Sequence, residues 1–438
     1  MHPSDTLRDT HSTVCQVLNQ FVAVATPHIG PGKLSFTETL LALVQQGRSL
    51  HSVFELMNSL PSIRWSESIT AQSKGLAPAT DPWAIRFGQL TGGLSEGVQL
   101  VELCNGPLTV SVLPTRGMGI WKAALQDIPV GWQSPVPHPV HPAYVNLQSR
   151  NGLGWLDGFN ELLCRCGLAF NGPPGNDEGN GSPIESEITL HGRIANIPAH
   201  SVEAGVDASG SVLSVTGIVD EATLFGPRLQ LTSSVYTEIG TSRFSIRDTI
   251  TNLGATATEV QILYHTNVGR PFLEQGSRLV CPVGTVVPRD ARAAEGIQSW
   301  PEYLPPTTGY AEQAYFFQLQ SDPDGNTLAL LRNSAGDRGF LVRYNVHQLP
   351  CFTQWKCTQP EAAGYVTGLE PGINYPNFKA FERHHGRVPK LEPGEDLTIE
   401  LHFDILDSTR QVEAAEQEVL DLQLDTPRTE PHPVSPFC

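Results

Sequence analysis

Three short segments of this chain carry side chains that can move protons, and they lie far apart in the sequence. They are Leu-His-Gly-Arg at 190–193, Tyr-His-Thr-Asn at 264–267 and Gly-Leu-Glu-Pro-Gly at 368–372. Each places an imidazole or a carboxylate among strand-forming residues. Two imidazoles and one carboxylate can remove one proton from a substrate and deliver another at neutral pH. The pattern predicts acid/base chemistry on a small molecule if the fold brings the three segments together.

Each segment taken alone also has a structural interpretation. His191 could face a cleft, because Gly192 lets backbone and substrate approach and Arg193 offers donors to hydroxyl groups. It could equally be a histidine bonded to a backbone carbonyl. His265 follows an apolar strand candidate and could line a site or sit in the core. Glu370, held between leucine and proline, could be a partly buried base with a raised pKa or an exposed turn residue.

Further residues could line a binding site. Arg116 lies in a glycine-punctuated strand exit, where it could anchor a sugar hydroxyl or simply turn the chain. Asn267 adds a polar group close to His265. Gln133 and Trp355 belong to segments that combine an aromatic ring with polar neighbours. Sugars stack their C–H faces on such rings, although a buried core tryptophan is at least as common.

Composition limits the classes of partner. The chain has 438 residues, a formal charge of −17 and 39% hydrophobic residues. Such a charge disfavours nucleic acid and anionic membranes but leaves a neutral small molecule unaffected. No apolar run is long enough to span a membrane, and no signal peptide is visible, so a cytoplasmic location is expected. The eight scattered cysteines are expected to be reduced. Neither a metal nor a cofactor is expected.

Three regions differ in texture. Residues 1–83 are expected to form a helical N-terminal extension with a linker, and residues 409–438 a C-terminal helix with a loose tail. Residues 84–408 alternate between strand patterns and turns, and Asn105-Gly106 is a hairpin signal. This predicts an all-β domain, a large antiparallel β-sandwich. The strand candidates are 98–103, 108–113, 187–190, 211–219, 229–237, 243–251, 257–265, 327–332, 339–346, 363–369 and 397–405.

The order of these segments resembles the aldose 1-epimerase (galactose mutarotase) superfamily over roughly residues 86–406. In that superfamily a first histidine lies near a Leu-His-Gly segment, and a second follows an Asn-containing turn. A glutamate then precedes a Leu-x-Pro-Gly-Glu turn. Here these look like His191, then His265 after Asn252, then Glu370 before residues 391–395. The segments 116–118, 131–135 and 190–193 resemble a poorly characterised mutarotase-like branch more than the well-studied galactose enzymes.

The resemblance implies a galactose mutarotase-like supersandwich and an isomerase that interconverts sugar anomers without a cofactor. It implies that His265 acts as the acid, that Glu370 acts as the base and that His191 binds or polarises the substrate. The family tends to have an aromatic pair and an asparagine soon after the second histidine. This chain has Thr-Asn-Val-Gly at 266–269 instead, so the pocket rim and the sugar can differ.

Two other functions remain open. The same acid and base could abstract a proton beside a carbonyl, which would make the protein an isomerase or lyase of a keto sugar or uronate. Alternatively, the protein could bind a carbohydrate without turnover, using the aromatic residues with Arg116 or Arg193. The expected partner in every case is a small-molecule sugar, and a homo-oligomer is left open.

Overall fold

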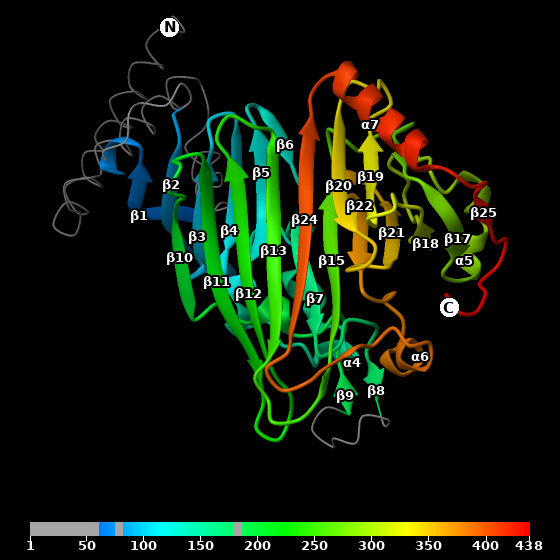
Figure 1. The fold of residues 1–438 in the computed structure, drawn as a ribbon, viewed down its shortest axis with the longest axis horizontal. Coiled ribbons are helices and arrows are strands. Elements are labelled where there is room, and N and C mark those ends of the chain that lie inside the picture. The colour runs from blue at the N-terminus through cyan, green and yellow to red at the C-terminus, as the bar shows by residue number, and fades with distance from the viewer. Residues whose placement is uncertain (1–60, 75–81, 178–185) are drawn as a thin grey trace, which may run out of the picture. The chain divides into compact units, whose positions relative to one another are not determined.

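Two β-sheets lie face to face in this computed structural model, which describes residues 61–74, 82–177 and 186–438. Figure 1 shows the long strands of one sheet lying across those of the other. The larger, thirteen-stranded sheet is formed by β1 (Ser62–Thr70), β2 (Ala84–Thr91), β3 (Gln99–Cys104), β4 (Leu108–Leu113), β5 (Gly119–Leu125), β6 (Ile128–Val130), β7 (Leu163–Leu168), β15 (Gln261–Val268), β17 (Val283–Pro288), β18 (Gln313–Leu319), β21 (Cys351–Thr358), β22 (Tyr365–Gly372) and β25 (Arg428–Thr429). The eight-stranded sheet is formed by β10 (Ser201–Val206), β11 (Val212–Ala222), β12 (Arg228–Glu238), β13 (Arg243–Asn252), β16 (Arg278–Val280), β19 (Asn326–Arg332), β20 (Gly339–Asn345) and β24 (Asp396–Leu406).

The remaining elements are short, apart from one helix near the C-terminus. Two small ribbons pair β8 (Gly175–Asn176) with β9 (Glu187–Ile188) and β14 (Thr258–Glu259) with β23 (Lys390–Leu391). The helices are α4 (Ser149–Gly152), α5 (Ala291–Ala294), α6 (Lys379–His384) and α7 (Thr409–Leu422), with 3-10 turns at η2 (Gln72–Lys74), η3 (Gly93–Ser95), η4 (Pro114–Arg116), η5 (Pro142–Tyr144), η6 (Gly154–Gly158), η8 (Ile194–Asn196), η9 (Ile297–Ser299) and η10 (Glu361–Ala363). None of these described helices is long and apolar enough to cross a membrane.

The main hydrophobic core lies between the two sheets. Ile262 and Tyr264 of β15 and Ile246 and Ile250 of β13 belong to one cluster of fully buried side chains. Successive side chains of a strand point to opposite faces of its sheet. Because Tyr264 points into this core, His265 lies on the other face of the thirteen-stranded sheet.

A buried polar network joins the strands β7 and β15 to the opposite sheet. Arg165 of β7 forms an ion pair with Asp248 of β13, and its Nη2 also donates to Ser233 Oγ at 2.8 Å. The Tyr264 hydroxyl donates to Asp248 Oδ2 at 2.9 Å. A buried charge is costly unless it is paired and hydrogen-bonded, and here both requirements are met. The network therefore fixes the strand that carries His265 relative to the second sheet.

The predicted fold class is confirmed, and so are most of the predicted strands. The hairpin expected at Asn105-Gly106 joins β3 to β4, which pair antiparallel. The candidates that alternate most clearly, such as 229–237 and 243–251, correspond to the long strands β12 and β13. Their alternation is clean because one face meets the core and the other meets solvent. By contrast, only two residues of the candidate 187–190 are in a strand, β9.

The β domain begins earlier than the boundary predicted at residue 84. Strand β1, inside the predicted extension and linker, pairs antiparallel with β2. Its polar sequence, Ser-Ile-Arg-Trp-Ser-Glu-Ser-Ile-Thr, gives a weak strand signal because an edge strand has little to bury. The compact unit that contains it starts at Pro61. The helices predicted before residue 60 lie outside the described residues.

The predicted C-terminal helix is α7, and it is not separate from the β domain. Its buried residues Val412, Ala415 and Val419 pack on side chains of the eight-stranded sheet. The tail after it was expected to be loose, which is wrong. Strand β25 pairs with β17, and Phe437 is 7% exposed in a cluster with Tyr375. An aromatic residue at the very end of the chain supplies the apolar surface that anchors the tail.

Candidate functional site

The central strands of the larger sheet bring the predicted acid and base together. Strand β15 lies between β7 and β22 and pairs antiparallel with both. His265 of β15 and Glu370 of β22 share the face that points away from the core. Their side chains meet, with 3.3 Å between His265 Nε2 and Glu370 Oε1. Residues 105 positions apart in sequence (370 − 265) are thus direct neighbours because their strands are adjacent.

The pair is almost completely buried. His265 is 5% exposed and Glu370 is 2% exposed. Burial penalises charged forms, so it lowers the pKa of a histidine and raises that of a carboxyl group. Burial therefore lowers the pKa of His265 well below its usual value, and the neighbouring His191 lowers it further. Burial also raises the pKa of Glu370 well above its usual value. Both shifts favour a state in which the pair holds one proton and no net charge.

Asn267 fixes the tautomer of His265. Its amide nitrogen donates to the carbonyl oxygens of Glu161 at 3.0 Å and His265 at 3.1 Å, which defines how the amide is turned. The amide oxygen lies 2.7 Å from His265 Nδ1 and accepts its proton. In the neutral ring Nε2 then has a free lone pair, directed at Glu370. Asn267 is fully buried, so the predicted substrate-binding role gives way to a positioning role.

Glu370 is held in place by the shape of its own strand. Gly368, two positions earlier, lies on the same face, and a Cβ atom there would overlap Glu370 Oε1. The missing side chain therefore makes room for the carboxylate to lie against the strand. Apart from the contact with His265, Oε1 is buried without a hydrogen-bond partner among the described residues. The polar neighbour of this oxygen is therefore His265 Nε2, with which it can share a proton.

His191 completes the group of proton-binding side chains. It has a φ of 58°, an uncommon backbone conformation for a residue with a side chain. Its Nδ1 donates to the carbonyl of Asn171 at 2.9 Å, and its ring centroid lies 5.4 Å from that of His265. Burial lowers the pKa of His191 to about 4. At neutral pH the ring is therefore uncharged, and its Nε2 is an acceptor.

Asn171 begins a stretch rich in glycine and acidic residues, 171–185, whose composition is typical of an exposed loop. It is instead fully buried, and its side chain exchanges hydrogen bonds with Asn374. The glycines and acids around it gave a misleading surface signal, because the polar side chain is satisfied inside the protein. Residues 178–185 lie outside the described part of the chain.

Aromatic side chains enclose the pair. The ring centroids of Phe159 and Trp355 lie 5.0 and 5.5 Å from that of His265, and Trp155 lies 4.7 Å from His191. Trp355 was predicted as a binding residue, whereas Trp155 and Phe159 were not. They come from the irregular, aromatic-rich region 135–181, whose texture is typical of functional loops but does not single out residues.

Three predicted binding residues have surroundings other than the pair in the contacts that the structure shows. Arg116 is 1% exposed, pairs with Glu161, and donates to the carbonyls of Val140 and Gly158 at 2.9 and 3.0 Å. These contacts commit it to holding loops together. Arg193 Nη2 lies 3.5 Å from Glu221 Oε1, and the side chain of Gln133 is exposed. Only residues that the fold turns toward His265 remain in the candidate site.

No metal site accompanies this arrangement. The described ranges contain no group of three or more His, Cys, Asp or Glu side chains placed to hold a metal ion. Cys164 and Cys166 are buried beside each other on β7, and burial raises the pKa of both thiols. Both thiols are therefore protonated at neutral pH.

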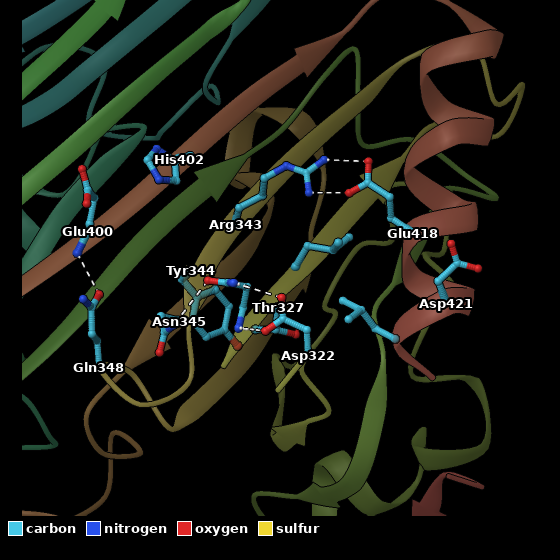
Figure 2. A pocket seen from close by; sticks show the side chains of 13 residues that line it. Asp322, Thr327, Arg343, Tyr344, Asn345, Gln348, Glu400, His402, Glu418 and Asp421 are labelled. Carbon is cyan, nitrogen blue, oxygen red and sulfur yellow. Dashed lines mark hydrogen bonds and ion pairs between the residues drawn. The ribbon is translucent and has the colours of Figure 1, made fainter. Parts of the chain in front are cut away.

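A separate groove of about 520 Å³ lies on the other sheet. Figure 2 shows its polar lining between β20, β24 and the helix α7, with Arg343 paired to Glu418. The groove contains neither His191, His265 nor Glu370. Its charged groups pair mainly with one another, so the chemistry of the chain is better sought at the buried pair.

Comparisons with known proteins identify the family and the fold. A family model described as "Domain of unknown function (DUF4432)" matches residues 95–405. The crystal structure of an inferred aldose 1-epimerase from Klebsiella pneumoniae is 33% identical, with a TM-score of 0.80 over 85% of this chain and 100% of that chain. A galactose mutarotase-like protein from Clostridium acetobutylicum is 13% identical, with a TM-score of 0.50 over 80% of this chain and 100% of that chain, which is a likeness of fold. The curated proteins give no match. This chain belongs to the DUF4432 family, and its fold is that of the galactose mutarotase-like proteins.

Proposed function

We propose that the protein is an aldose 1-epimerase, an isomerase that interconverts the two anomers of a sugar by opening and closing its ring. The observation that carries the proposal is the contact between Glu370 Oε1 and the Nε2 of a histidine of fixed tautomer, because that carboxylate oxygen has no other polar partner among the described residues. In the proposed complex a sugar hydroxyl donates to this carboxylate. The 33% identity to the Klebsiella protein supports the same assignment.

The proposed reaction needs one proton on the His265–Glu370 pair. Transfer of that proton from Glu370 to His265 Nε2 leaves Glu370 as carboxylate and His265 as imidazolium, and Glu370 then removes the proton of the anomeric hydroxyl. His265 Nε2 protonates the ring oxygen as the bond between that oxygen and the anomeric carbon breaks. The resulting aldehyde rotates about one bond, and the ring closes on the other face while both protons return. Each well-placed acid or base contributes roughly 10²- to 10⁴-fold in rate.

His191 holds the substrate in this proposal. Its Nδ1 proton is used by the carbonyl of Asn171, so the neutral ring offers only an acceptor at Nε2. It therefore accepts a hydrogen bond from a sugar hydroxyl and cannot polarise the ring oxygen by donation. The low pKa of about 4 keeps this assignment throughout the neutral range.

Anomer exchange measured by NMR tests the proposal. A panel of unphosphorylated aldoses is held at anomeric equilibrium, and saturation of one anomeric proton is followed to the other. The protein is expected to accelerate transfer for at least one aldose. A rate equal to that in buffer for every member of the panel, with folded protein, would remove the proposal.

The same experiment in D₂O separates anomerisation from the alternative chemistry. Ring opening exchanges only hydroxyl protons, so the proton on C2 is retained. Abstraction of a proton beside a carbonyl would replace it with deuterium and remove its NMR signal. Loss of that signal from an aldose, or new ultraviolet absorbance from a uronate, would point to an isomerase or a lyase instead.

Replacing Gly368 with alanine is expected to lower kcat by up to about 10²-fold, because the new methyl group displaces the Glu370 carboxylate from His265. Gly205→Ala is the matched control. Gly205 also lies in a strand, and a Cβ there has nothing within 4 Å. Equal kcat values for the two variants would show that the position of the carboxylate does not govern the rate.

A further inference from the structure

We propose that Glu312 and Arg289 form the specificity subsite of this site, binding two adjacent hydroxyl groups of an uncharged sugar away from its anomeric carbon. The inference rests on the proposed function and deepens it by naming the substrate class. Neither residue stands out in the sequence, because each lies just outside a strand of the larger sheet.

Three neighbouring strands of the larger sheet carry the subsite residues and Trp355. Trp355 lies in β21, Glu312 immediately precedes β18, and Arg289 immediately follows β17. Strand β18 pairs with both of the others, and Ala314 is opposite Trp355. The backbone N–H of Arg289 donates to the carbonyl of Ala314 at 2.9 Å, which fixes it beside Glu312.

The side chains of the subsite form a hydrogen-bonded chain that starts at Trp355, whose ring contacts that of His265. The ring of Trp355 lies 5.5 Å from that of His265, and its Nε1 donates to Glu312 Oε2 at 2.6 Å. Arg289 Nη2 donates to Glu312 Oε1 at 3.1 Å. The Glu312 side chain is 48% exposed and that of Arg289 is 32% exposed. The two subsite residues are therefore accessible to solvent, whereas His265 and Glu370 are buried.

The charges of the subsite are felt by the catalytic groups. Glu312 contributes to the raised pKa of Glu370, and Arg289 opposes that shift. The same two residues act in opposite directions on the pKa of His191. The geometric link between the subsite and the catalytic pair is Trp355, which contacts His265 and donates to Glu312.

The chemistry of the subsite selects for hydroxyl groups. The carboxylate accepts hydrogen bonds and the guanidinium donates them, which matches two hydroxyls on neighbouring carbons. Arg289 Nη1 makes no hydrogen bond to a described residue, whereas Nε donates to Asp290 at 2.9 Å. A second guanidinium, Arg292, donates from Nε to the carbonyl of Ala311 at 3.2 Å and pairs with Glu295. The three carboxylates Glu312, Asp290 and Glu295 still outnumber the two guanidinium groups. A phosphate or a uronate carboxylate would meet a net negative surface, so neutral sugars are favoured.

Glu312→Gln provides the test, with Glu302→Gln as its matched control. Glu302 also pairs with an arginine on the surface, Arg278, at 2.5 Å, and it is 57% exposed. Glutamine can still accept the hydrogen bond from Trp355 Nε1, so the position of the Trp355 ring is kept. For the aldose turned over fastest, Glu312→Gln is expected to raise KM by roughly 10-fold with little change in kcat, and Glu302→Gln to change neither.

A series of monodeoxy sugars locates the contact. The deoxy sugar that lacks the hydroxyl held by Glu312 is expected to have the same KM with Glu312→Gln as with the unaltered protein. A penalty from Glu312→Gln that is equal for every deoxy sugar, or a change in kcat alone, would overturn the proposal. Equal KM values for Glu312→Gln and Glu302→Gln would also overturn the proposal. If no aldose is turned over, the proposed function fails, and binding of the same neutral sugars followed by ligand NMR then tests the subsite: weaker binding by Glu312→Gln alone supports it.

Discussion

Glu370→Gln is expected to lower kcat by about 10³-fold or more while leaving the fold intact. Glutamine has nearly the same shape but cannot take a proton from the anomeric hydroxyl, so the base is lost. His265→Asn is expected to have an effect of similar size, because asparagine cannot protonate the ring oxygen. Both variants are measured by saturation transfer between the anomers, at a pH where the unaltered protein is most active.

The double variant sharpens this prediction. If His265 and Glu370 act as one unit that shares a proton, removing both costs little more than removing either. Two independent losses that multiply would show that each residue acts without the other. Glu382→Gln is a suitable control, since Glu382 is also a buried glutamate but pairs with Arg387 outside the site. It is expected to lower thermal stability while the folded protein keeps its kcat.

Much of the fold could be predicted from local patterns alone. Strands that face the core on one side and solvent on the other alternate clearly in sequence, as 229–237 and 243–251 do. Strand β7, with every residue buried, escaped notice because a strand covered on both faces has no alternation to detect. Strand β1 and the tail around Phe437 depend on contacts that are distant in sequence, which no local pattern records.

In the candidate site, too, some residues could be predicted from the sequence, whereas others depend on contacts that only the fold creates. His265 and Glu370 could be proposed from their types and their order, and the adjacency of β15 and β22 brings them together. Whether a polar residue faces the substrate or the interior depends on the whole fold. Arg116 carries the donors expected of a sugar ligand, but Glu161 and backbone carbonyls use them. Glu312 looks like any surface acid until the pairing of β18 with β21 places it beside Trp355.

Asn267→Leu is expected to lower kcat by roughly 10²- to 10³-fold, because His265 then loses the acceptor that holds its Nδ1 proton. Leucine fills a similar volume but accepts no hydrogen bond, so the neutral His265 ring can carry its proton on either nitrogen. Only the molecules with the proton on Nδ1 then present an Nε2 lone pair to Glu370. The change acts on the acid alone, since the carboxylate of Glu370 is held separately by the space above Gly368. Kinetics at several pH values and a thermal melt distinguish this effect from unfolding.

Asn267→Asp keeps nearly the same side-chain shape but places a negative charge beside His265. The imidazolium form of His265 is disfavoured in this protein, because burial and the neighbouring His191 lower its pKa. A carboxylate at position 267 favours the imidazolium and raises that pKa, by roughly 1 to 3 units for an adjacent opposite charge. The pair then keeps its last proton to higher pH, so the alkaline limb of the kcat profile is expected to move upward. Asn267→Leu should show no such movement. An alkaline limb that stays in place in Asn267→Asp would mean that the acid in the reaction is not the histidine that Asn267 holds.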